Sequence, residues 1–205
     1  MKTTGDYILK RMRKAEKGAA FTAKDFLDLA GYEAAKKSLG RLADTGTLRR
    51  ILRGVYDFPA YSPVKKGPAT PRPDAVAHAI ARAHGWTLIP TGETALNLLG
   101  LSTQVPAQWQ YCSNGPTKCY QWPGGNVLLK HCAGRQTSGL SSKTILIVQA
   151  LKALGRDAVT DEVLGFLRHR LTVTECRQAV SETRHLPIWM QSAIKCLAEK
   201  EGIHA

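Results

Sequence analysis

The stretch from Phe21 to Phe58 reads FTAKDFLDLAGYEAAKKSLGRLADTGTLRRILRGVYDF, and it decides the fold of the first part of the chain. Thr22 stands three residues before Asp25, a spacing typical of a helix start, where the hydroxyl accepts a free amide and the carboxylate faces the helix dipole. We expect a short helix from about Ala23. Gly31 is expected to end it with a positive φ angle.

A second helix follows the glycine. Ala35, Leu39 and Leu42 recur at i, i+4 and i+7, which predicts one buried stripe. The opposite face carries basic and small side chains, namely Lys36, Lys37, Ser38 and Arg41. A narrow basic face of this kind fits the major groove of DNA, about 12 Å wide, and small residues allow close approach to the bases.

Two β-prone runs complete the pattern. Residues 48–52 and 55–58 flank Arg53 and Gly54, a pair suited to a tight turn between antiparallel strands. The hairpin carries Arg49, Arg50 and Arg53, which we take as candidate contacts to flanking phosphates or to an adjacent minor groove. A helix, a turn, a basic helix and an arginine-rich hairpin in this order are typical of a winged helix-turn-helix, so the sequence predicts DNA binding.

Charge agrees with this prediction. The chain has 205 residues and a net charge of +13, and residues 1–66 hold 15 Lys and Arg against 7 Asp and Glu. A positive field attracts any polyanion, so charge alone does not separate DNA from RNA or an acidic membrane. The longest apolar run, near residues 145–154, is far shorter than the roughly 20 residues of a membrane span, and no export signal precedes the motif. We therefore expect a cytoplasmic protein that has no membrane partner.

The remaining sequence predicts an α+β protein with three parts. Residues 1–60 form the winged helix-turn-helix, with a first helix near residues 4–16 whose Tyr7, Ile8 and Met12 face inward. Residues 61–73 form a proline-rich linker, and residues 74–205 form a mixed α/β domain. This last domain is expected to hold a small antiparallel meander and a helical C-terminal part. Its elements are helices near 74–84, 93–99, 142–154, 160–171, 174–183 and 187–200, and strands near 86–90, 109–113, 118–122 and 126–130.

Two segments together carry a resemblance to a known family. SLGRLADTGTLRRILRGVYDFP at residues 38–59, followed by PTGETALNLLGLSTQVP at residues 90–106, resembles the AbiEi-type antitoxins of type IV toxin-antitoxin systems. The resemblance spans roughly residues 22–157. It implies a bacterial antitoxin whose winged helix binds operator double-stranded DNA and represses its own operon. It also implies a C-terminal domain that counteracts a toxin of the nucleotidyltransferase class, and DNA-reading positions within residues 36–41 and at Arg49, Arg50 and Arg53.

Other chemistries find less support in the sequence. The five cysteines lack CxxC spacing, which favours reduced thiols over a disulfide framework, and His131 beside Cys132 is weak evidence for zinc. The loop at residues 134–144 lacks the Gly-Lys pair of a phosphate-binding Walker motif, and the carboxylates are scattered. We expect no cofactor, no metal and no catalytic activity. Two alternatives stay open: an enzyme targeted to nucleic acid, and an interaction module that binds the toxin directly. Two copies side by side on repeated DNA sites are a further expectation.

Overall fold

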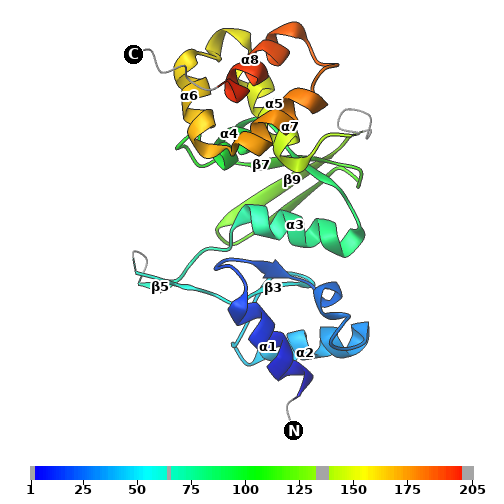
Figure 1. The fold of residues 1–205 in the computed structure, drawn as a ribbon. Coiled ribbons are helices and arrows are strands. Elements are labelled where there is room, and N and C mark those ends of the chain that lie inside the picture. The colour runs from blue at the N-terminus through cyan, green and yellow to red at the C-terminus, as the bar shows by residue number, and fades with distance from the viewer. Residues whose placement is uncertain (1–2, 64–65, 133–138, 200–205) are drawn as a thin grey trace. The chain divides into compact units, whose positions relative to one another are not determined.

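The N-terminal stretch folds as the predicted winged helix-turn-helix within an α+β chain (Figure 1). The computed structural model describes residues 3–63, 66–132 and 139–199. The winged helix has six elements in chain order: α1 (Thr4–Lys14), β1 (Ala20–Phe21), η1 (Ala23–Phe26), α2 (Tyr32–Asp44), β2 (Arg49–Leu52) and β3 (Val55–Asp57). The strands form an antiparallel sheet of order β1-β3-β2.

The core of the winged helix follows the apolar periodicity of its helices. Ile8, Phe26, Ala35 and Leu39 are fully buried and belong to one cluster, and Leu42 packs against it half-buried. The predicted stripe of α2 is therefore confirmed. Tyr7, in contrast, is 48% exposed, so the expectation that it faces inward is wrong.

The first helix of the helix-turn-helix is shorter than predicted. Only the 3-10 helix η1 forms from Ala23 onward, and turn hydrogen bonds to the carbonyl of Phe26 continue it to Ala30. Leu27 lies 52% exposed. Gly31 does not end this segment with a positive φ. Its φ is −59°, and it is the N-cap of α2, a position at which no side chain hydrogen-bonds to the first turn of the helix.

A short hairpin and a helix follow the wing. The predicted linker contains a two-stranded hairpin, β4 (Tyr61–Ser62) with β5 (Gly67–Pro68). It leads to α3 (Pro73–His84), in which proline occupies the first turn and Gly85 closes the helix at φ +70°. Figure 1 shows the small sheet between α1 and α2 on one side and α3 on the other.

Strands and helices of the remaining chain lie close to their predicted ranges. The strands are β6 (Leu88–Pro90), β7 (Trp109–Ser113), β8 (Lys118–Trp122) and β9 (Gly125–His131). The helices are α4 (Glu93–Leu99), α5 (Ser142–Leu154), η3 (Arg156–Ala158), α6 (Asp161–Arg170), α7 (Val173–Glu182) and α8 (Ile188–Ala198). The predicted meander is wrong in its order, because the sheet runs β6-β7-β9-β8. Residues 134–138 of the Walker-like loop and Lys200, the predicted end of the last helix, lie outside the described ranges.

Two compact units divide the chain at places that the sequence did not predict. One unit holds Met1–Leu88 and Asn114–Leu129, and the other holds Ile89–Ser113 and Lys130–Ala205. Thus α3, β8 and most of β9 belong with the winged helix, although a boundary at residue 73 was expected. The second unit has its own core, built from apolar faces of α4 to α8 that include Leu99, Ile147, Leu151, Leu167 and Ile194. No helix in the described ranges combines the length and apolarity needed to cross a bilayer.

Candidate nucleic-acid interface

The basic face of α2 is exposed as its periodicity predicts. Lys36, Lys37 and Arg41 are exposed, and Ser38 is half-buried between them. Lys36 is partly neutralised, because its Nζ lies 3.3 Å from a carboxylate oxygen of Glu33 one turn earlier. Within the described part of the chain, neither Lys37 nor Arg41 pairs with a carboxylate. These two cations are therefore the ones most available to an outside anion.

The wing presents one arginine at its tip. β2 and β3 pair across Leu52 and Val55, which places Arg53 and Gly54 in the connecting turn, and Gly54 adopts φ +83°. A left-handed conformation at this position favours glycine. Arg53 is exposed. The hairpin thus projects a cation at its tip, as the sequence predicts.

Arg50 and Arg49 have different surroundings on the same strand. The Arg50 guanidinium lies 5.6 Å from the centre of the Tyr56 ring, its Nη2 is 3.6 Å from Asp44, and half of its side chain is exposed. Arg49 faces inward and donates two hydrogen bonds to the carboxylate of Asp57, one from Nε at 3.0 Å and one from Nη2. Its Nη1 donates to the carbonyl of Ala69 at 2.7 Å. All of these donors are used inside the protein, so we leave Arg49 out of the interface and assign it a structural role.

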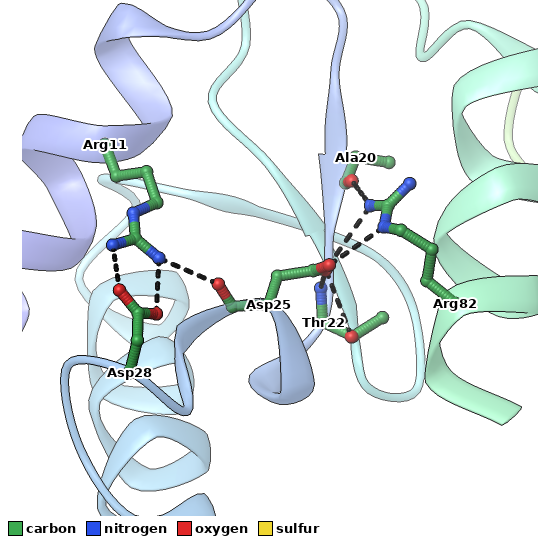
Figure 2. A network of polar contacts seen from close by, with 6 residues as sticks. All are labelled: Arg11, Ala20, Thr22, Asp25, Asp28 and Arg82. Carbon is green, nitrogen blue, oxygen red and sulfur yellow. Dashed lines mark hydrogen bonds and ion pairs between the residues drawn. The ribbon is translucent and has the colours of Figure 1, made fainter. Parts of the chain in front are cut away.

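A network of polar contacts holds η1 between two helices (Figure 2). The Asp25 carboxylate accepts from the amide of Thr22 at 2.7 Å and from Nε of Arg82 in α3 at 2.8 Å. Arg82 also donates to the carbonyl of Ala20 at 2.9 Å. On the other side Arg11 of α1 donates to the Asp25 carbonyl at 3.0 Å. The helix that supports α2 is therefore fixed from both sides.

The same network includes a bidentate ion pair. Arg11 donates to the two carboxylate oxygens of Asp28 at 2.7 and 2.5 Å (Figure 2). The hydrogen bond from Arg11 lowers the pKa of the Asp28 carboxyl below its ordinary value, and the same bond raises the pKa of Arg11. Both charges are thus kept at neutral pH. Because the pair is largely exposed, its role is to orient the loop before α2, with little effect on stability.

A cavity of about 920 Å³ opens beside these basic residues, entirely within the compact unit that contains the winged helix. Lys36 of α2 borders it together with Arg50 and Arg53 of the hairpin, so these predicted residues share one concave surface. Lys37, Ser38 and Arg41 are not among its lining residues. The cavity also brings in residues that the sequence reasoning missed, chiefly Lys24, Tyr32, His84, Lys118 and Tyr120.

The missed residues had only a weak signal in the sequence. Lys118 and Tyr120 are two apart in a strand and so share one face of β8, a pattern visible without a structure. Their proximity to the winged helix was not visible, because more than sixty residues separate β8 from the wing along the chain. The predicted histidine–cysteine pair also changes meaning, since Cys132 forms a disulfide with Cys112, and these two thiols are therefore not reduced as expected. In the described ranges no three His, Cys, Asp or Glu residues gather to hold a metal ion.

Comparison with known proteins places the chain in a family. A search of curated proteins finds no match. A family model matches residues 7–176, which include the winged helix from the second turn of α1 onward, both strands of the β8–β9 hairpin, and the chain as far as the start of α7. This match extends over most of the 205 residues, and the chain therefore belongs to the family of unknown function DUF6088.

Proposed function

We propose that the chain binds double-stranded DNA through α2 and the wing. The observation that carries the proposal is the meeting of Lys36 from α2 with Arg50 and Arg53 from the hairpin around one concave surface. Lys37 and Arg41 add two exposed cations on the same helix. Helix residues of this kind reach base edges in the major groove, and wing residues contact the flanking phosphates.

The elements around α2 are suited to DNA binding because hydrogen bonds fix their positions. Base-specific contacts require a helix whose position is fixed before binding. Here the Asp25 carboxylate joins η1 to α3 through Arg82, and Arg11 joins α1 to the Asp25 carbonyl (Figure 2). Arg49 and the buried Asp57 fix the base of the wing.

The biological role that we propose rests on the resemblance to AbiEi-type antitoxins. Occupancy of operator DNA by α2 and the wing would exclude polymerase and repress the chain's own operon. The remaining part of the chain would counteract a nucleotidyltransferase-class toxin encoded beside it. Because the proposed ligand is chromosomal DNA, the proposed location is the bacterial cytoplasm, and repeated half-sites would favour two copies on the DNA. Growth rescue when the chain is co-expressed with the neighbouring gene product tests the antitoxin role, and continued growth arrest contradicts it.

A gel-shift experiment with the chain's own upstream region tests DNA binding. The triple substitution Lys36→Ala, Lys37→Ala and Arg41→Ala is expected to abolish specific retardation, since it removes every cation of the α2 face. Arg53→Ala is expected to weaken binding evenly across sequences and to lower the slope of log affinity against log salt by about one. Lys130→Ala, an exposed lysine outside the winged helix, is the charge-matched control. Unchanged retardation by the triple variant would refute the assignment of α2.

A further inference from the structure

Duplex binding explains only part of the lining of the cavity beside the wing. Five cations border it, namely Lys24, Lys36, Arg50, Arg53 and Lys118, and no carboxylate among the described residues does. Lys24, Arg53 and Lys118 form no ion pair with any described carboxylate. Its volume of about 920 Å³ is in the range of small-molecule sites, which is roughly 300–1,000 Å³. The cavity is therefore a concave anion-attracting site.

Three of these cations each lie over the ring of one tyrosine. The Nζ of Lys36 lies 5.8 Å from the centre of the Tyr32 ring, and the Nζ of Lys118 lies 5.0 Å from the centre of the Tyr120 ring. The Arg50 guanidinium lies over Tyr56. Tyr32 is 46% exposed, and Tyr120 is half-buried. Three walls of the cavity, from α2, the hairpin and β8, thus each supply a cation with an aromatic ring.

Cations and exposed rings together match an unpaired nucleotide better than a duplex. A duplex offers phosphates and groove edges, but its base faces are stacked inside and cannot meet a tyrosine. An unpaired nucleotide offers both a phosphate for the cations and a base face for the ring. Tyr120 also has a raised pKa because burial disfavours its charged form, so the phenol stays neutral and suited to stacking.

We propose that this cavity is a nucleotide site, in which Arg53 and Lys118 hold phosphate and Tyr32 and Tyr120 stack on the base. The nucleotide is either free in solution or part of a single strand, and both present the same chemistry. Lys36, Arg50 and Arg53 also belong to the proposed duplex interface. Occupancy of the cavity therefore competes with operator binding, which makes the nucleotide a regulator of DNA affinity.

The test measures the binding of three kinds of labelled probe to the full chain by fluorescence anisotropy. They are ATP and GTP analogues labelled on the ribose, a labelled single-stranded oligothymidylate of about eight nucleotides, and the labelled upstream duplex. The variants are Lys118→Ala, Tyr120→Leu and Tyr120→Phe, with Lys130→Ala as the charge-matched control. Lys118 is exposed, so its truncation leaves folding intact, and thermal melting verifies the tyrosine variants.

The wild-type chain is expected to bind the analogues, the single strand or both, and the probe that binds identifies the source of the nucleotide. Lys118→Ala and Tyr120→Leu are expected to weaken that binding about tenfold or more. Tyr120→Phe, which keeps the ring, and Lys130→Ala stay within about twofold of the wild type. Excess unlabelled nucleotide is expected to release the duplex.

Two results would overturn the proposal. One is the absence of binding to both unpaired probes, or binding that Lys118→Ala and Tyr120→Leu leave unchanged. The other is an equal loss of duplex binding in these variants, because the cavity would then belong to the duplex footprint alone. The double variant Lys37→Ala and Arg41→Ala, whose residues do not line the cavity, separates the two functions. It is expected to lose operator binding and to retain nucleotide binding. Failure of the duplex proposal is therefore distinguishable from failure of the nucleotide proposal.

Discussion

At the scale of single residues, the pairing of Arg49 with Asp57 is the most consequential contact in the winged helix. Asp57 is 1% exposed, and Arg49 covers its carboxylate while also binding the carbonyl of Ala69. Removing one partner of a buried pair leaves an unpaired charge, at a cost of about 3–5 kcal/mol when both groups are fully buried. Solvent reduces this cost here, since 28% of the Arg49 side chain is exposed.

Arg49→Ala is therefore expected to lower the free energy of unfolding by about 2–4 kcal/mol. Arg53→Ala, on the exposed wing tip, is expected to change it by less than about 0.5 kcal/mol. Urea denaturation followed by circular dichroism measures both values. Equal stability of the two variants would contradict the structural role of Arg49. It would also return Arg49 to the set of candidate DNA contacts.

At the scale of elements, the disulfide between Cys112 and Cys132 links the end of β7 to the residue after β9, 20 positions apart in sequence. Under denaturing conditions without reductant, alkylation is expected to modify the three remaining cysteines, Cys119, Cys176 and Cys196. After reduction all five cysteines are expected to react, and mass spectrometry counts the alkylated cysteines in each sample. Modification of five cysteines in the unreduced protein would exclude the disulfide.

Removal of the disulfide by Cys112→Ala and Cys132→Ala is expected to destabilise the protein by about 3 kcal/mol.

Elements with a strong local signal were predictable from the sequence. Helix α4 and strands β7 and β8 match their predicted ranges, because apolar periodicity and flanking turn residues are local properties. Gly31 shows the limit of such reasoning. A glycine between two helices signals a break, but the sequence does not say whether it closes the first helix or opens the second.

The candidate site was predictable only in part, because some of its residues depend on contacts between distant segments. Exposure of Lys36, Lys37 and Arg41 follows from the buried stripe of their own helix. The inward orientation of Arg49 depends on the carboxylate of Asp57 across the hairpin. Apolar and polar residues alternate imperfectly along β2, so the sequence did not reveal which arginines face inward. The contribution of Lys118 and Tyr120 depends on contacts between segments far apart in sequence, which local patterns do not encode.

At the scale of the whole molecule, charge and architecture support one another. The basic excess is concentrated in residues 1–66, which carry 15 Lys and Arg against 7 Asp and Glu, and the structure adds Lys118 to the same unit. A positive field attracts any nucleic acid, so affinity alone does not establish an operator-binding function. Discrimination between sequences does, because it requires contacts to base edges.

The most direct test is therefore the ratio of affinities for the upstream duplex and for a scrambled duplex of equal length, measured at one fixed salt concentration. We predict that the wild-type chain prefers the upstream duplex. We also predict that Lys37→Ala with Arg41→Ala reduces this preference at least about tenfold, since each base contact contributes ~1–3 kcal/mol of discrimination. Lys130→Ala should leave the ratio unchanged. A wild-type ratio near one, or a ratio that the α2 substitutions do not alter, would contradict the account.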